Sequence, residues 1–343
     1  MHLSWEPFTL NLKTTFRIAH GASDKRHNVF VHLSQDGTCN PRLEGVGEAA
    51  GVPYFGETQE GIIAYLESLA SSIGTNLSWD PFLMEDTLNS LPPGSLAARN
   101  AIDLALHDLL GKQLEQPLYR LLGLNPQKAP LTSFTVSIDD PALVAERARQ
   151  SKMPIIKIKL GGEDDEATVA AVRQSTPARI RVDANAGWSR EQAARLIPRL
   201  TQYDLEFIEQ PLAVGDIEGL RWLRSKKLGV PIFADENIRT ARDVASHAAA
   251  VDGVVIKLMK SAGIRQALRA IHTAHALDIQ VMIGCMVESS LGVTAAAHLS
   301  PLCEFADLDA PLLINNDPYQ GLKYEGARMI LPDRPGLGVI PKN

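Results

Sequence analysis

Lysines and acidic residues recur at nearly equal spacing through the middle of this 343-residue chain. Each stands at the C-terminal end of a short apolar run that is typical of a buried strand, and these residues are Lys159, Asp183, Glu209, Asp235 and Lys257. Steps of 24, 26, 26 and 22 residues separate them, which is enough chain for one strand, one helix and two loops. The pattern predicts a parallel (β/α) barrel, in which polar residues at the C-terminal ends of the strands form the active site.

Three of these acidic residues are predicted to converge at the barrel mouth. Asp183, Glu209 and Asp235 end three consecutive strands, so their carboxylates should lie on one side of the mouth. Carboxylates held that close repel one another unless a cation lies between them. Ligation by oxygen alone suits Mg²⁺ or Mn²⁺, so we expect one such ion per chain.

Two lysines are predicted to face each other across the same cavity. Lys159 and Lys257 end the second and sixth strands, which are four apart in a ring of eight and therefore diametrically opposed. Two amines that flank one substrate carbon can remove a proton from one face and return it to the other. Positive charge from the metal and from the other lysine should lower the pKa of each amine toward a value useful in a base.

The rest of the chain supplies the elements that must position these residues. Alternating strands and helices from residue 131 onward give eight strand markers, which are Thr135, Lys159, Asp183, Glu209, Asp235, Lys257, Cys285 and Asp307. Ahead of them, strand-like segments at 8–12, 29–33 and 42–48 and helical periodicity at 61–73 and 95–111 predict a separate α+β unit. Residues 311–343 contain no ninth repeat, and their Pro and Gly content suggests a tail that folds back on the first unit.

Composition limits the class of protein. With 45% hydrophobic residues, the chain can bury a full barrel and a second domain. The net charge of -6 gives no electrostatic footprint for nucleic acid or for an anionic membrane. No run of 18 apolar residues occurs, and the first residues lack a basic segment followed by an apolar stretch. We therefore expect a cytoplasmic protein with a small-molecule partner, for which a homo-oligomer is one option.

The polar motifs, in this order, resemble those of the enolase superfamily in its muconate-lactonising subgroup. A KxK strand, a DxN, an EQP, a DE pair and an opposing lysine recur there, and this chain has them at 157–159, 183–185, 209–211, 235–236 and 257. Segments 256–260, 284–289 and 307–309 further resemble the dipeptide epimerases. Segments 47–48, 54–58 and 101–109 resemble the capping domain of the family, so the resemblance covers nearly the whole chain.

The resemblance implies a fold and a division into domains. The expected class is α/β, a (β/α)8-type TIM barrel modified to (β/α)7β, with an N-terminal α+β capping domain that is completed by the C-terminal tail. Residues 1–125 would form the capping domain, with a substrate-closing loop near 16–28, and residues 126–310 the catalytic barrel. Residues 311–343 would return to the capping domain.

The resemblance also implies an activity, that of an isomerase acting on L-Ala-Xaa-type dipeptides. Such an epimerase inverts the α-carbon of the C-terminal residue by two-base 1,1-proton transfer through a metal-stabilised enediolate. Lys159 and Lys257 would be the catalytic bases, and the three carboxylates would hold Mg²⁺ or Mn²⁺. Asp307 and Asp309 would grip the ammonium of the substrate, since residues at i and i+2 of a strand point to the same face.

Other residues receive supporting roles from the same resemblance. Lys157 would interact with the substrate carboxylate, and Thr135 and Glu288 are further substrate-binding candidates. Glu288 equally fits an acid that starts a helix and interacts with its dipole. Asn185 and Glu236 would orient the metal ligands and the lysines.

One departure from the family pattern concerns specificity. The arginine that reads a glutamate side chain in Ala-Glu epimerases aligns with Gly21 in this chain. The sequence therefore does not predict a preference for Ala-Glu. Lys25 or Arg26 could replace that arginine, although basic residues in a polar loop are more often simply solvated.

Two alternatives stay open. The first is another enzyme of the subgroup: o-succinylbenzoate synthase, an N-acylamino acid racemase or a cycloisomerase. The substrates of these enzymes lack a free ammonium, so Asp307 and Asp309 would have no partner. The second is a noncatalytic metal-binding or ligand-binding barrel, which would not need both opposed lysines.

Overall fold

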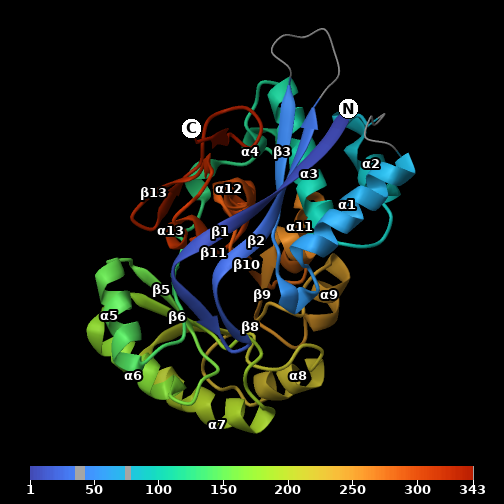
Figure 1. The fold of residues 1–343 in the computed structure, drawn as a ribbon. Coiled ribbons are helices and arrows are strands. Elements are labelled where there is room, and N and C mark those ends of the chain that lie inside the picture. The colour runs from blue at the N-terminus through green and yellow to red at the C-terminus, as the bar shows by residue number, and fades with distance from the viewer. Residues whose placement is uncertain (35–42, 74–78, 343) are drawn as a thin grey trace.

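The chain forms a small antiparallel sheet with helices, followed by a parallel barrel (Figure 1). The computed structural model describes residues 1–34, 43–73 and 79–342. The first sheet has the order β1 (His2–Ile18), β2 (Gly21–Ser34) and β3 (Glu44–Ala49). The helices that follow are α1 (Gln59–Ile73), α2 (Met84–Ser90), α3 (Leu96–Gln113) and α4 (Leu118–Leu121). The predicted α+β unit is therefore present.

Helix α3 packs against β3 at very close range. A Cβ atom on Gly45 would lie 2.0 Å from the carbonyl oxygen of Ala105, and one on Gly47 would lie 1.9 Å from that of Ala101. Only glycine permits such an approach, and the small alanines on the helix permit it from the other side. The close contact fixes the helix on the sheet.

Eight parallel strands form the barrel in simple chain order. They are β4 (Phe134–Val136), β5 (Ile155–Lys159), β6 (Arg179–Asp183), β7 (Leu205–Glu209), β8 (Ile232–Ala234), β9 (Gly253–Lys257), β10 (Gln280–Gly284) and β11 (Phe305–Asp307). A parallel bridge between Thr132 and Ala306 joins the first strand region to the last. The backbone N–H of Ser133 donates to the carbonyl of Ala306 at 3.1 Å, which closes the ring.

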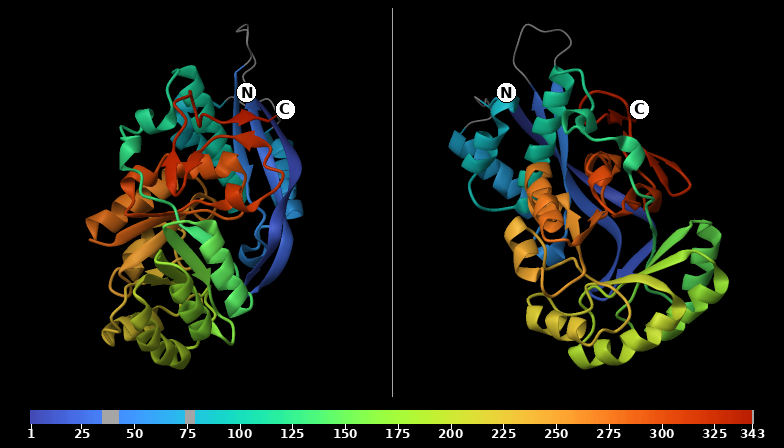
Figure 2. Two further views of the ribbon diagram at one scale, coloured as in Figure 1. Left: turned by 90° about the vertical axis from the view of Figure 1, so that its left-hand side faces the viewer. Right: turned by 180° about the vertical axis from the view of Figure 1, so that it is seen from behind.

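Seven helices connect these strands and cover the outside of the sheet (Figure 2). They are α5 (Pro141–Ser151), α6 (Asp165–Ser175), α7 (Arg190–Leu200), α8 (Ile217–Ser225), α9 (Ala241–His247), α11 (Ile264–Ala276) and α12 (Ser290–Ala297). Two four-residue helices follow strands directly, α10 (Leu258–Ser261) after β9 and α13 (Ala310–Leu313) after β11. Because no long helix follows β11, the (β/α)7β form of the barrel is confirmed. Among the described residues, no helix has the length and apolar character needed to cross a bilayer.

An apolar layer fills the barrel below the mouth. Phe207, Phe233, Val255 and Met282 pack together with Phe305. Each precedes a residue near the mouth by two positions on its strand, so both point into the barrel. The rings of Phe207 and Phe233 stack at 4.2 Å between centroids. An apolar layer therefore lies directly beneath the polar site and packs the strand interiors together.

The segment 16–28, expected as a loop, is instead the end of a β-hairpin. Strand β1 continues to Ile18 and β2 begins at Gly21, so only Ala19 and His20 lie outside the strands. Phe16 pairs with Ser23 across the hairpin. The small and polar side chains of this segment do not predict a strand. Backbone pairing across a two-residue turn nevertheless continues both strands, because it does not depend on apolar side chains. Figure 1 shows the hairpin extending from the first sheet down to the barrel.

The tail after α13 contacts the first sheet. It contains two short antiparallel pairs, β12 (Tyr319–Gln320) with β15 (Ile340–Pro341) and β13 (Lys323–Glu325) with β14 (Arg328–Ile330). Ile314 forms a bridge with Leu12, and the N–H of Asn11 donates to Oδ1 of Asn316 at 2.7 Å. These contacts agree with a returning tail, while the boundaries at 125 and 310 stay predictions.

Candidate active site

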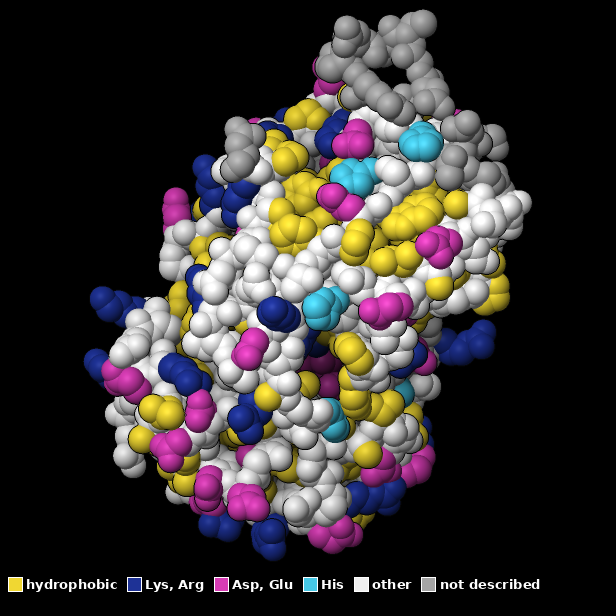
Figure 3. All heavy atoms as spheres, viewed as in Figure 1, with side chains coloured by type: hydrophobic (Ala, Val, Ile, Leu, Met, Phe, Trp, Pro, Cys, Tyr) yellow, Lys and Arg dark blue, Asp and Glu magenta, His cyan; other side chains and the backbone are white. Residues whose placement is uncertain are grey.

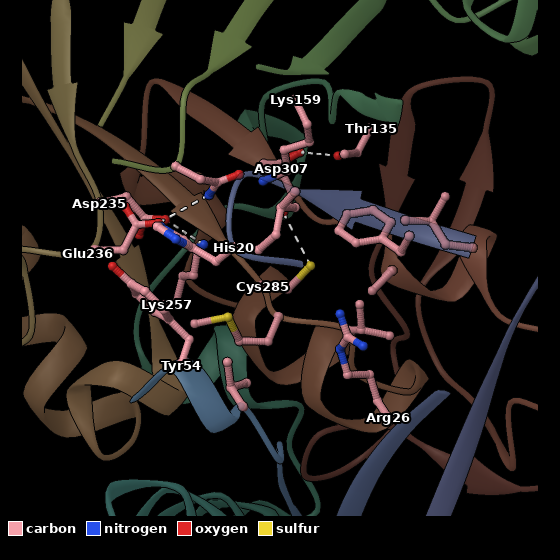
Figure 4. A pocket seen from close by; sticks show the side chains of 18 of the residues that line it. His20, Arg26, Tyr54, Thr135, Lys159, Asp235, Glu236, Lys257, Cys285 and Asp307 are labelled. Atoms are coloured by element: carbon pink, nitrogen blue, oxygen red, sulfur yellow. Dashed lines mark hydrogen bonds and ion pairs between the residues drawn. The ribbon is translucent and has the colours of Figure 1, made fainter. Parts of the chain in front are cut away.

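One pocket lies between the barrel mouth and the end of the hairpin (Figure 4). Lys159, Lys257 and Asp309 line it from the barrel, and Phe16 and Ile18 line it from the hairpin. Figure 3 shows acidic side chains at the bottom of a hollow near the middle of one face. The pocket therefore joins the strand ends to the first domain.

Three acidic residues meet at the mouth as the strand spacing predicts. Carboxylate oxygens of Asp183, Glu209 and Asp235 lie within 4.8 Å of one another, and all three residues are buried. Asp183 and Glu209 are direct neighbours in the register of β6 and β7, and Asp235 follows β8 immediately. Parallel strands of matched length thus bring the three carboxylates to one level.

The triad has the properties of a site for a divalent cation. Oε1 of Glu209 is buried and has no hydrogen-bond partner among the described residues, while Oε2 lies 2.7 Å from the amine of Lys157. Burial, followed by repulsion from Asp183, raises the pKa of Glu209 well above its ordinary value. A hard cation bound by oxygens would satisfy these atoms and offset the repulsion, so the residues fit Mg²⁺ or Mn²⁺.

Two lysines enter the pocket from different sides (Figure 4). Lys159 ends β5 and Lys257 ends β9, which are four strands apart in the ring of eight. The amine of Lys159 donates to Oδ2 of Asp183 at 2.6 Å, and that of Lys257 donates to Oδ2 of Asp235 at 2.7 Å. A Cβ on Gly284 would lie 3.2 Å from Cε of Lys257, so the glycine leaves room for this side chain.

The pKa of Lys257 departs from the expected direction. Burial disfavours its charged form, but the negative charge of Asp235 outweighs this effect, so the pKa of Lys257 is raised. The expectation of a lowered pKa considered the metal and the other lysine and omitted the carboxylate in direct contact. A cation bound by the triad would lower the pKa of Lys257, which opposes the effect of Asp235.

Lys157 lies beneath the pocket and is fully buried. Its amine is 2.7 Å from Oε2 of Glu209, 3.1 Å from Oδ2 of Asp183 and 2.8 Å from Oδ2 of Asp307. Burial opposes its charge, but Asp307 and then Glu209 raise the pKa of Lys157 well above its ordinary value. The carboxylates therefore favour the charged form of this lysine, and its interaction with a substrate carboxylate stays a prediction.

The pair Asp307 and Asp309 lines the pocket beside Thr135. Hydrogen bonds fix both carboxylates, since Ser133 Oγ donates to Asp307 at 2.6 Å and the N–H of Thr135 donates to Asp309 at 2.6 Å. Burial and the neighbouring Asp307 raise the pKa of Asp309 to about 7. A positively charged ligand beside Asp309 would stabilise its ionised carboxylate.

Asn185 and Glu236 connect the strand ends around the triad. The side-chain amide of Asn185 donates to Oε1 of Glu236 at 3.1 Å, and its backbone N–H donates to Oδ1 of Asp183 at 2.9 Å. Burial and the charge of Asp235 raise the pKa of Glu236 to about 7. Both side chains line the pocket, which agrees with their predicted orienting role.

Glu288 is placed differently from the other candidates. It is buried beside the pocket loop, where Oε1 accepts from the N–H of Met286 at 2.8 Å. Burial and the charge of Glu48 raise the pKa of Glu288 to about 7. Its position two residues before α12 agrees with the alternative of a helix-start acid, and its contact with substrate stays a prediction.

Two residues that contact Asp235 belong to the sequence motifs but were given no role in the sequence analysis. The amide of Gln210 accepts the N–H of Asp235 at 2.8 Å. Lys260 donates to the backbone carbonyl and to Oδ1 of Asp235. Gln210 follows Glu209 directly, and Lys260 is three residues after Lys257. Their closeness in sequence to these two residues is the only feature that could have pointed to them.

Family models match both parts of the chain. The family model described as "Enolase C-terminal domain-like" matches residues 141–343, and the model of the mandelate racemase / muconate lactonizing enzyme N-terminal domain matches residues 6–123. The chain belongs to the enolase superfamily. The resemblance drawn from the polar motifs is thereby confirmed, and both the barrel and the first domain belong to this superfamily.

Several relatives within the superfamily are named as epimerases of dipeptides. The L-Ala-D/L-Glu epimerase of Bacteroides thetaiotaomicron is 37% identical, over 99% of this chain and 88% of the relative. The hydrophobic dipeptide epimerase of Roseobacter litoralis is 39% identical, over 98% of each chain. The dipeptide epimerase of Enterococcus faecalis, solved with Mg and the dipeptide L-Leu-L-Tyr, superposes with a TM-score of 0.91 at 32% identity, over 98% of each chain.

Proposed function

We propose that this protein is a metal-dependent dipeptide epimerase, which inverts the α-carbon of the C-terminal residue of a dipeptide by 1,1-proton transfer. The observation that carries the proposal is the pair Lys159 and Lys257, which end strands four apart and line one pocket beside a carboxylate triad. Full-length relatives named as dipeptide epimerases support it.

Asp183, Glu209 and Asp235 would hold Mg²⁺ or Mn²⁺. When bound, the cation supplies positive charge to the carboxylate of the substrate's C-terminal residue, which favours negative charge developing there. The three ligands need little rearrangement, since their oxygens already lie within 4.8 Å of one another. The contacts of Gln210 and Lys260 keep Asp235 in place.

The two lysines would carry out the proton transfer. Lys159 in its neutral form takes the α-proton from one face, which leaves an enediolate, and the ammonium of Lys257 returns a proton to the opposite face. The reverse reaction uses the same groups with their protonation exchanged. Each amine donates to an aspartate of the triad, so both bases are held at the pocket before a substrate arrives.

Asp307 and Asp309 would bind the ammonium of the first residue and so set the direction of the dipeptide in the pocket. Their burial and their fixed hydrogen bonds favour a charged partner over a neutral one. This argues against an N-acylated amino acid, which has no ammonium to offer. The net charge of -6 also supports a small-molecule partner over nucleic acid.

A library of dipeptides incubated in D₂O and analysed by mass spectrometry tests the proposal. We expect one deuterium at the α-carbon of the C-terminal residue, together with appearance of the second epimer. Exchange confined to N-acylated amino acids would favour a racemase of the same superfamily, and no exchange in any substrate would favour a binding barrel.

A further inference from the structure

The pocket has two ends with different chemistry. Tyr54 lies at one end. Burial, followed by the negative charges of Glu236 and Asp235, raises the pKa of its hydroxyl. The ring of His20 stacks on that of Tyr54 at 4.5 Å between centroids. This end adjoins the carboxylate triad, and it would therefore hold the C-terminal residue of a dipeptide.

The other end of the pocket lies beside α13, the helix that begins directly after Asp309, and it contains an arginine. Arg26 pairs directly with Leu10 across β1 and β2, so both side chains leave the sheet on the same face. Leu10 packs there with Ile314, and Leu313 and Val287 lie against the same cluster. Leu313, Val287 and Arg26 all line the pocket. Figure 4 shows Arg26 across the pocket from Glu236 and Lys257.

The guanidinium of Arg26 lacks an acidic partner among the described residues. Its one hydrogen bond in that part of the chain is to the carbonyl of its neighbour Lys25, at 2.9 Å. The side chain is half-buried, and burial lowers the pKa of Arg26 without any compensating charge. A partly desolvated cation that faces a ligand pocket is suited to bind an anion from the ligand.

We propose that Arg26 determines specificity by binding a side-chain carboxylate on the first residue of the substrate. The inference rests on the proposed function, since Asp307 and Asp309 place the first residue at this end of the pocket. The enzyme would then prefer dipeptides that begin with L-Asp or L-Glu over those that begin with L-Ala. Arginine suits the task because its planar fork can donate two parallel hydrogen bonds to one carboxylate.

The test compares acid and amide at each position of the dipeptide. The substrates are L-Asp-L-Ala with L-Asn-L-Ala, L-Glu-L-Ala with L-Gln-L-Ala, and the reversed pair L-Ala-L-Glu with L-Ala-L-Gln. The readout is kcat/KM for α-deuterium exchange in D₂O at saturating Mg²⁺. We expect the acid to exceed the amide by about tenfold at the first position, the difference between a hydrogen bond to a charged group and one to a neutral group.

Variants test whether Arg26 causes the preference for the acid over the amide at the first position. Arg26→Gln should bring the acid-to-amide ratio at the first position close to one, and Arg26→Glu should favour L-Lys-L-Ala over L-Glu-L-Ala. Lys25→Gln removes an exposed positive charge from the adjacent position and should leave the ratio unchanged. Because ratios are compared within each variant, a general loss of activity does not obscure the result.

Three results would overturn the inference while leaving the proposed function intact. They are a parental ratio near one, a ratio that survives both Arg26 variants, and an acid preference confined to the second position. Absence of exchange in every dipeptide, with exchange in N-succinyl amino acids, would instead overturn the proposed function and this inference together.

Discussion

The amine of Lys157 lies 2.7 Å from Oε2 of Glu209, in a part of the barrel where neither side chain is exposed to solvent. The same amine also contacts Asp183 and Asp307. Lys157 thus joins the metal triad to the proposed ammonium site. Because loss of one member of a buried ion pair leaves an uncompensated charge, we expect removal of this lysine to destabilise the fold.

Replacing Lys157 with methionine should lower the free energy of unfolding by about 3 to 5 kcal/mol, because three buried carboxylates lose their shared cation. Urea denaturation in EDTA measures this. Lys323→Met, which changes an exposed residue of β13, is the control and should stay within about 0.5 kcal/mol of the parent. An unchanged midpoint for Lys157→Met would show that the lysine carries no such role.

Asp235→Asn should abolish epimerisation and weaken Mg²⁺ binding, because it removes one anionic ligand from the triad. Titration calorimetry with Mg²⁺ and a single cooperative melting transition separate lost binding from lost folding. Asp278→Asn alters an exposed aspartate with φ near 54°, a conformation that asparagine also adopts, and should behave like the parent. Undiminished turnover in EDTA would be incompatible with a metal-dependent reaction.

Replacing Asp309 with alanine should reduce kcat/KM for a dipeptide by an amount equivalent to about 2 to 5 kcal/mol, since the substrate ammonium loses a buried partner. Acetylation of the dipeptide's amine should cost the parent enzyme a similar amount. Acetylation should lower the kcat/KM of the Asp309→Ala variant less than it lowers that of the parent. If the parent prefers acetylated substrates, the pair does not bind an ammonium.

Stability should fall in mild acid because of His298. Its Nδ1 accepts the N–H of Tyr119 at 3.2 Å and its Nε2–H donates to the carbonyl of Leu337 at 3.1 Å. Burial lowers the pKa of His298 to about 4, against 6.5 when exposed. As the pH falls, the histidine of the unfolded chain binds a proton before that of the folded chain. The contribution of His298 to the free energy of unfolding is therefore complete above pH 6.5, and roughly 3 kcal/mol is lost as the pH falls toward 4.

The variant His298→Gln isolates this contribution, because other groups titrate in the same range. Its free energy of unfolding should depend less on pH between 4 and 6.5 than that of the parent. His272→Gln changes an exposed histidine and should keep the parental pH dependence. Parallel curves for the parent and His298→Gln would contradict the assignment.

The barrel and the triad could be predicted because their signals are local. A buried strand of a parallel barrel is a short run of mainly apolar residues, and the spacing of Asp183, Glu209 and Asp235 matches one strand-helix repeat. Closure of the ring then determines which strand ends are neighbours and which are opposed. No further information was needed to bring these carboxylates together.

The contacts that surround the site depend on residues far apart in the chain. The N–H of Thr135 meets Asp309 across 174 residues, and neither residue type predicts the other. The pairing of Arg26 with Leu10 arises only once the hairpin extends beyond the segment that looks like a strand. The pKa of Lys257 likewise follows from its contact with Asp235, which the strand positions alone do not specify.

The central claim is that Lys159 and Lys257 act on opposite faces of one α-carbon, and single-lysine variants in D₂O test it most directly. Lys257→Ala should still exchange the α-hydrogen of the L,L-dipeptide without forming the second epimer, because Lys159 is predicted to act on that face. Lys159→Ala should exchange only the L,D-dipeptide. Epimerisation by either variant at a rate near that of the parent, or exchange of the same epimer by both variants, would contradict the two-base mechanism.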